Sequence, residues 1–195
     1  MGAGIAGIKV GILALQGSFI EHARSVEMCG ARAVAVRKPE DLEGVRGLII
    51  PGGESTTIGK LMARYGLDQR IRELAASGMP IYGTCAGLIL LAGHVLSSSQ
   101  PVLGMMDITV MRNAYGRQVE SFEADLRIPA IGEAPFKGVF IRAPRIEATG
   151  PEVEALAYLD GKAVLARQGH FLASSFHPEL TGDLRIHSYF LSMAS

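Results

Sequence analysis

The sequence has no tryptophan, only two cysteines and no excess of charge of either sign. Its 19 basic and 19 acidic residues cancel, so the electrostatic attraction to nucleic acids and anionic membranes is missing, and we expect neither as a partner. No apolar run approaches the length of a membrane span, and the N-terminus lacks the basic start and apolar core of a signal peptide. Cys29 and Cys85 show no metal-ligand spacing and are too few for a disulfide framework. We therefore expect a cytoplasmic protein with no metal site.

A chain of 195 residues is long enough for one sizeable core, and we expect a single domain over residues 1–195. The motif G-x-G-x-x-G at Gly2, Gly4 and Gly7 is not a dinucleotide fingerprint, because it precedes the first strand instead of joining a strand to a helix. In the first half, apolar strands alternate with helical patterns. Strands are expected at residues 8–15, 33–36, 47–50 and from residue 81, and helices at residues 19–29, 58–65 and 68–76.

This alternation predicts an α/β fold with a mostly parallel, doubly wound sheet and functional loops at the carboxyl ends of its strands. The second half has a different pattern. Phe122, Ala124, Leu126 and Ile128 alternate as in antiparallel or half-exposed strands. A short strand is expected at residues 139–142, a hairpin at 163–167 and 171–176, and a final helix at about 183–193.

The segment Gly83-Thr84-Cys85-Ala86-Gly87 follows a short apolar strand and runs directly into an apolar helix. It is typical of a nucleophile elbow, in which flanking glycines permit a sharp turn that exposes one reactive side chain. A helix beginning near Ala86 directs its amides and positive dipole end toward Cys85, which favours the thiolate. The amide of Ala86 is a candidate oxyanion donor. A buried, inert cysteine is the alternative, and the glycines argue against it.

The segment His177-Pro178-Glu179 supplies the base and acid that a cysteine nucleophile needs. If the segment is extended, positions 177 and 179 share one side of it. Glu179 would then accept a hydrogen bond from one imidazole nitrogen while the other nitrogen faces the thiol. By itself the tripeptide is weak evidence, but together with the elbow it predicts a Cys85, His177 and Glu179 triad.

A glycine-containing loop, Pro51 to Thr57, follows the third expected strand. Two adjacent glycines let backbone amides turn toward a ligand, so Gly53 is a candidate for a second oxyanion donor opposite Ala86. The other interpretation, a helix-capping turn of serine and threonine, is equally compatible with the loop taken alone.

With these motifs in this order, the sequence resembles the class I (triad) glutamine amidotransferases over essentially its whole length. Within that class it is similar to the glutaminase subunits of pyridoxal 5′-phosphate synthases. The matching segments are Leu13 to Gly17, Pro51 to Thr57, Gly83 to Gly87, Arg112 to Gln118, Ser121 to Asp125 and Phe140 to Pro144. The resemblance implies a three-layer α/β/α, flavodoxin-like fold with additional antiparallel strands.

The resemblance also implies a chemistry. Cys85 attacks the side-chain amide of L-glutamine to form a glutamyl thioester, His177 relays protons and Glu179 orients His177. The residues implied to hold glutamine are Gly53, Glu54, Ser55, Arg112, Ile141 and Arg142. Guanidinium groups suit a substrate carboxylate, although solvated surface arginines are the plainer explanation of Arg112 and Arg142 without the resemblance.

The implied partner is a (β/α)₈-barrel synthase subunit that receives the ammonia within a large hetero-oligomer, and no cofactor is expected on this chain. Three alternatives remain open. One is a stand-alone cysteine hydrolase or peptidase of the same fold, and another is a non-enzymatic redox or binding module with an accessible thiol. The third, a glutaminase of another pathway such as histidine biosynthesis, is disfavoured by the segments Arg112 to Gln118 and Phe140 to Pro144.

Overall fold

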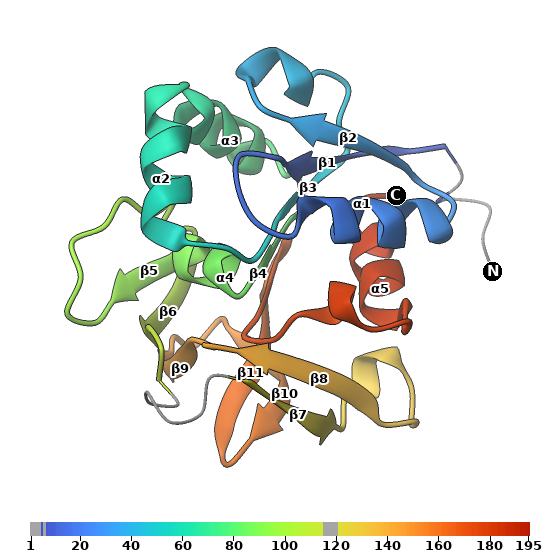
Figure 1. Cartoon of the computed structure of the whole chain (residues 1–195), viewed down its shortest axis with the longest axis vertical. Coiled ribbons are helices and arrows are strands. Elements are labelled where there is room, and N and C mark those ends of the chain that lie inside the picture. The colour runs from blue at the N-terminus through green and yellow to red at the C-terminus, as the bar shows by residue number, and fades with distance from the viewer. Residues whose placement is uncertain (1–4, 6, 115–120) are drawn as a thin grey trace.

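A seven-stranded sheet runs through the centre of the molecule, in the order β10-β11-β12-β4-β3-β1-β2 (Figure 1). The computed structural model describes residue 5, residues 7–114 and residues 121–195. Strands β12, β4, β3, β1 and β2 are parallel, whereas β11 is antiparallel to both β12 and β10. The strands are β1 (Lys9–Leu13), β2 (Arg32–Val36), β3 (Gly47–Ile50), β4 (Ile81–Thr84), β10 (Glu154–Leu159), β11 (Lys162–Gln168) and β12 (Phe171–Ser174). The prediction of a mostly parallel sheet is confirmed.

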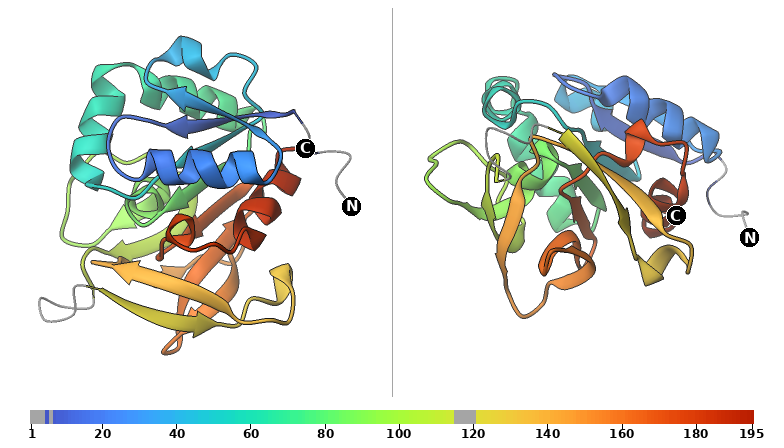
Figure 2. Two further views of the ribbon diagram at one scale, coloured as in Figure 1. Left: turned by 45° about the vertical axis from the view of Figure 1, so that its right-hand side comes forward. Right: turned by 60° about the horizontal axis from the view of Figure 1, so that its bottom comes forward.

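Helices cover both faces of this sheet and make three layers (Figures 1 and 2). One face carries α1 (Phe19–Met28) and α5 (Arg185–Met193). The other carries α2 (Ser55–Arg64), α3 (Leu67–Ala76) and α4 (Ala86–Leu91). Three short 3₁₀ helices are η1 (Pro39–Leu42), η2 (Pro129–Ile131) and η3 (Pro178–Leu180). The three-layer α/β/α architecture is therefore as predicted.

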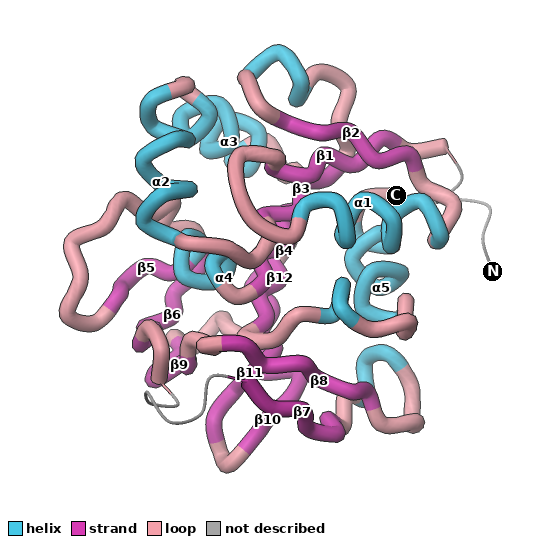
Figure 3. Tube along the Cα trace, viewed as in Figure 1, coloured by secondary structure: helices cyan, strands magenta, loops and turns pink. Residues whose placement is uncertain are grey.

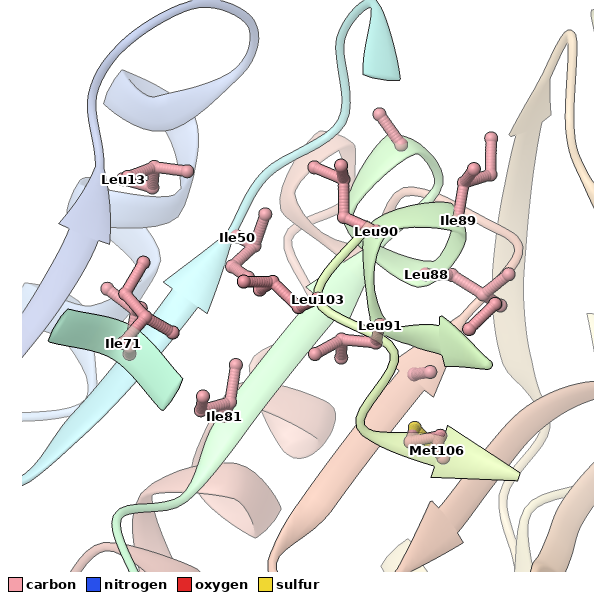
Figure 4. Packing of buried hydrophobic residues seen from close by; sticks show 14 of the residues in the cluster. Leu13, Ile50, Ile71, Ile81, Leu88, Ile89, Leu90, Leu91, Leu103 and Met106 are labelled. Carbon is pink, nitrogen blue, oxygen red and sulfur yellow. The ribbon is translucent and has the colours of Figure 1, made fainter. Parts of the chain in front are cut away.

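The apolar runs of the central strands follow from burial on both faces. In β3, Leu48 and Ile50 point into the core under α2, α3 and α4, whereas Ile49 points to the opposite core under α1 and α5. Side chains alternate along a strand, so a strand covered on both sides is apolar throughout. Figure 4 shows one of these cores, to which Ile50 and Ile81 of the sheet and Leu90 and Leu91 of α4 all belong.

Two smaller sheets flank the central one. The first contains β5 (Ala92–Val95), β6 (Met106–Met111) and β9 (Arg145–Thr149). The second is the antiparallel pair β7 (Ser121–Leu126) and β8 (Phe136–Ile141). The antiparallel character expected around Phe122 to Leu126 is confirmed. Strands β5, β6, β9 and β10 were not expected, because β5 continues the apolar run of α4 without a turn signal and the other three pair with shifts in register.

The expected hairpin about Gln168-Gly169-His170 is present, with β11 and β12 antiparallel on either side of it. Helix α2 starts at Ser55, earlier than expected, because the Glu54 carboxylate caps it by accepting hydrogen bonds from the amides of Thr56 and Thr57. The interpretation of this loop as a capping turn is thus partly correct, with glutamate as the cap. In the described part of the chain, no helix combines the length and apolar character needed to cross a membrane.

Candidate active site

A cleft of about 350 Å³ is lined by residues of the loops that follow β1, β3 and β4. Figure 3 shows the backbone of these loops at the carboxyl edge of the sheet. Nine residues that the sequence analysis singled out line it: Gly53, Glu54, Ser55, Cys85, Ala86, Arg112, Ile141, Arg142 and His177. Glu179 lies behind His177 and is only 6% exposed. The structure therefore brings all the predicted site residues to one place.

The elbow has the geometry that its glycines predict. Cys85 sits between the end of β4 and the start of α4, with a φ of 50° that side chains rarely adopt. A side chain at position 83 would collide with the backbone of Gly87, and one at position 87 would collide with the carbonyl of Ile50. Glycine at both positions therefore lets the turn pack closely enough to lift Cys85 to the cleft.

Sheet register brings His177 to Cys85. Strand β12 lies parallel to β4 with Ser174 beside Thr84, and the amide of Cys85 donates to the carbonyl of Ser174 at 2.8 Å. Beyond the strand, the His177 amide donates to the Val139 carbonyl of β8, also at 2.8 Å. The side chains of Cys85 and His177 both lie close to Gly52. Any side chain at position 52 would collide with the His177 ring.

Glu179 lies against His177 as expected, but the backbone conformation that brings them together differs from the expected one. Nδ1 of His177 lies 2.8 Å from Oε1 of Glu179, and the Ser18 hydroxyl donates to the same oxygen at 2.6 Å. The segment is not extended, because residues 178–180 form the 3₁₀ helix η3. The expectation that positions 177 and 179 share one side of a strand is therefore wrong, since Pro178 at the first helical position starts a turn.

The surroundings of His177 and Glu179 shift the pKa values of both side chains. Burial alone would lower the pKa of His177, but its hydrogen bonds and charge interactions with Cys85 and Glu179 outweigh burial and raise the pKa to about 10. Burial would likewise raise the pKa of Glu179, yet its interactions with His22, His177 and Ser18 lower it to about 2. Glu179 is thus an anion at neutral pH that stabilises a protonated His177 beside Cys85.

The other side of the cleft is built around an ion pair. A guanidinium nitrogen of Arg112 lies 3.0 Å from Oε1 of Glu54, and the second donates to the Thr56 hydroxyl at 3.2 Å. Burial is the largest single influence on Glu54 and opposes its ionisation, but hydrogen bonds from Thr57 and Thr56 and the charge of Arg112 together outweigh it and lower the pKa. Arg112 is therefore already paired with a carboxylate before any ligand is bound.

Residues 141 and 142 close the cleft beside the nucleophile. The Cys85 thiol points to the carbonyl of Ile141, with 3.9 Å between sulfur and oxygen. Arg142 has a φ of 41° and is exposed, and no carboxylate in the described parts of the chain pairs with it. Its guanidinium is free to meet a carboxylate entering the cleft.

The two candidate oxyanion donors differ in their setting. Ala86 is the first residue of α4, so no carbonyl within the helix accepts its amide. Gly53 lies under the loop of Gln16 to Ser18, whose Ser18 amide donates to the Gly52 carbonyl at 3.1 Å. Oε1 of Gln16 accepts a hydrogen bond from the Glu54 amide at 2.7 Å. This loop is packed directly onto the glycine pair.

The structure adds residues that the sequence analysis did not assign to the site. A serine directly before a helix is typical of a helix cap, but the Ser18 side chain makes no cap hydrogen bond to α1 and donates to Glu179 instead. Its position after β1, at the same sheet edge as Cys85, is the signal that could have identified it. Asn113 and Leu180 also line the cleft. Residues 115–118 of the matching segment Arg112 to Gln118 lie outside the described residues.

Comparison with known proteins gives a consistent result. The sequence matches the SNO glutamine amidotransferase family over residues 12–195. It is 61% identical to pyridoxal 5′-phosphate synthase subunit PdxT of Pelotomaculum thermopropionicum, covering 94% of each chain. The PdxT of Desulforudis audaxviator is 59% identical, with 94% of this chain and 97% of that protein covered.

Solved structures show the same fold. A crystal structure of a glutamine amidotransferase superposes with a TM-score of 0.91 at 53% identity, covering 95% of this chain and 98% of that one. The structure of PurLQS from Thermotoga maritima has a TM-score of 0.68 at only 15% identity, covering 96% of this chain and 99% of that one. The second likeness concerns the fold alone.

Proposed function

Because the chain belongs to the SNO glutamine amidotransferase family and is a glutamine-hydrolysing enzyme, we propose that Cys85, His177 and Glu179 carry out this hydrolysis. The ammonia that they release serves the synthesis of pyridoxal 5′-phosphate. The observation that carries the proposal is the placement of Cys85 on a strained turn beside a buried, carboxylate-bound histidine. The family match and the high identity to the PdxT relatives indicate that the chain is the glutaminase subunit of a pyridoxal 5′-phosphate synthase.

The reaction proceeds through a thioester. The Cys85 thiolate attacks the side-chain carbonyl carbon of L-glutamine, and the carbonyl electron pair moves to the oxygen, which the amides of Ala86 and Gly53 stabilise. Collapse of this intermediate breaks the C–N bond, and His177 gives its proton to the departing ammonia. His177 then removes a proton from water, which attacks the thioester and releases glutamate and the thiolate. Glu179 keeps His177 in the required tautomer throughout.

The remaining predicted residues hold the substrate. Arg142, which has no carboxylate partner in the described part of the chain, suits the α-carboxylate of glutamine, and Glu54 suits its α-ammonium group. Arg112 positions Glu54 through their ion pair and can turn toward the substrate carboxylate. Gly53, Ser55 and Ile141 form the walls on either side.

Ammonia becomes protonated in water and loses its nucleophilicity, so it is best transferred without release. We therefore propose that the partner is a synthase subunit with a (β/α)₈ barrel, which receives ammonia within a large hetero-oligomer. The support comes from the PdxT relatives, which are named as subunits of a synthase.

The direct test measures glutamate released from L-glutamine by the purified chain, alone and mixed with the synthase subunit. Strong stimulation on mixing supports a glutaminase that its partner activates. Equal rates in both samples would instead indicate a stand-alone hydrolase of the same fold. No release in either sample would contradict the proposal.

A further inference from the structure

Behind Glu179 the protein buries two histidines that the proposed mechanism does not use. His22 belongs to α1 and His187 to α5, and both side chains are fully buried. Nε2 of His22 lies 3.3 Å from Oε2 of Glu179, and Nδ1 of His22 lies 3.0 Å from Nε2 of His187. Oε2 of Glu179 has no hydrogen-bond partner in the described part of the chain, which leaves the His22 ring as its near polar neighbour.

The same His22 nitrogen also reaches the elbow. Nε2 of His22 lies 3.1 Å from the hydroxyl oxygen of Thr84, the residue immediately before Cys85. Thr84 is fully buried at the end of β4. One imidazole therefore touches both the carboxylate that orients His177 and the residue that precedes the nucleophile.

These contacts select one tautomer. A neutral imidazole has one N–H and one bare nitrogen. A bare Nε2 would face the Glu179 carboxylate with its lone pair, which is repulsive, so the proton of His22 resides on Nε2. Nδ1 of His22 then accepts, and the proton must come from Nε2 of His187. This arrangement leaves Nδ1 of His187 as the one nitrogen of the two rings that neither donates nor accepts, in agreement with its lack of a partner within the described residues.

Both histidines remain neutral at physiological pH. Burial is the largest influence on His22 and lowers its pKa, although the nearby Glu179 charge opposes the effect. Burial and the neighbouring His22 lower the pKa of His187 to about 3. A neutral His22 offers Glu179 an N–H dipole without forming a competing ion pair, so the carboxylate keeps its negative charge for His177.

We propose that His22, held in one tautomer by His187, is a positioning residue that fixes the Glu179 carboxylate and the Thr84 end of the elbow relative to each other. The proposal rests on the triad assigned above and deepens it. His22 does not touch the substrate. Its role is to keep the Oε1 atom of Glu179 aimed at His177 while the elbow carries Cys85.

The test compares His22→Leu with His22→Gln. Leucine fills a similar volume but removes the N–H, whereas the glutamine amide nitrogen can donate from nearly the position of Nε2. We expect His22→Leu to lower kcat about 10-fold to 100-fold, as is usual for partners that orient active-site ligands, with KM for glutamine changed less than about 2-fold. His22→Gln should recover most of kcat. The matched control is His170→Gln, a half-buried histidine that contacts the Ala75 carbonyl away from the cleft and should leave kcat unchanged.

A readout without substrate separates this proposal from the proposed function. The proton shared by His177 and Glu179 should give a low-field ¹H NMR signal in the wild-type chain and in His22→Gln, and exchange with solvent should broaden it in His22→Leu. Wild-type kcat and an unchanged signal in folded His22→Leu would overturn the proposal. If His22→Leu does not fold, His187→Gln gives the second test. We expect it to lower kcat by less than His22→Leu would. An unchanged kcat in His187→Gln would contradict the proposal that His187 holds His22 in one tautomer. A chain that hydrolyses no glutamine but shows the predicted NMR change would contradict only the function.

Discussion

The two sides of the cleft are built on different principles. On the catalytic side, Cys85, His177 and Glu179 are at most 8% exposed and are fixed by backbone hydrogen bonds, strand register and close glycine contacts. On the binding side, the side chains of Arg112 and Glu54 are 32% and 44% exposed and are held by an ion pair. One side is therefore a rigid part of the core, and the other is a rim of long side chains.

The difference in energetics follows from burial. An exposed ion pair such as Arg112 with Glu54 contributes only about 0–1 kcal/mol, so a ligand can rearrange it at little cost. Removing one partner of a buried charged group costs considerably more, because the remaining charge is left without compensation. We expect substitutions on the catalytic side to affect turnover and those on the binding side to affect substrate affinity.

The largest effect is expected from Cys85→Ala. It removes the nucleophile and should lower kcat by about 10⁶-fold, as in other triad enzymes, while we expect the fold to persist because the thiol contacts only groups of the cleft, His177 and the Ile141 carbonyl. Glutamate release and circular dichroism together test this. Near wild-type turnover in Cys85→Ala would exclude the thioester mechanism.

Next in size is the comparison of His177→Asn with Glu179→Gln. His177→Asn removes the base and should approach the loss of Cys85→Ala, whereas Glu179→Gln should cost about 10⁴-fold, because the ring remains but its tautomer is no longer fixed. Steady-state kcat values measure the order. A larger loss in Glu179→Gln than in His177→Asn would show that the carboxylate does more than orient the ring.

On the binding side, Arg112→Ala should raise KM for glutamine about 10-fold to 100-fold with a smaller change in kcat, since charge-assisted hydrogen bonds to the substrate and to Glu54 are lost. Its free energy of unfolding should fall by less than about 1 kcal/mol. Initial-rate kinetics and urea denaturation measure both quantities. A fall in kcat with unchanged KM would place Arg112 on the catalytic side instead.

The last prediction concerns acid stability and leaves activity at neutral pH aside. The pKa of Glu179 is lowered from its ordinary 4.5 to about 2, so the unfolded chain binds this proton at higher pH than the folded chain. The stabilisation is fully present above about pH 5 and is lost progressively as the pH falls toward 2. In urea denaturation at several pH values, Glu179→Gln should flatten this dependence. The exposed Glu27→Gln is the control, and an equal flattening there would refute the assignment to Glu179.

The catalytic side was the more predictable from sequence, because its geometry follows from short-range constraints. Gly83 and Gly87 are required by backbone contacts, and apolar strands specify the sheet that places β12 beside β4. The conformation of residues 177–179 was mispredicted, since a histidine before a proline is expected to be extended, whereas Pro178 begins the 3₁₀ turn of η3 directly after His177. The pairing, however, was correct.

Sequence patterns could not indicate the contacts between residues that are far apart in the chain. Ser18 reaches Glu179 across 161 positions, and His22 reaches His187 across 165. Ser18 looks like an ordinary helix cap, and each histidine looks like an isolated core residue until the fold brings α1 and α5 together. The single-domain organisation, the cytoplasmic location and the individual roles of the site residues stay predictions.

The central claim is that Cys85 forms a covalent glutamyl thioester, and mass spectrometry tests it most directly. The chain is incubated with L-glutamine, quenched in acid and digested, and the two cysteine peptides are compared. Cys29, half-buried beside Ser188, is an internal control. The account predicts a glutamyl group on the Cys85 peptide and none on the Cys29 peptide. Absence of the adduct from Cys85 during active turnover, or equal labelling of both cysteines, would contradict it.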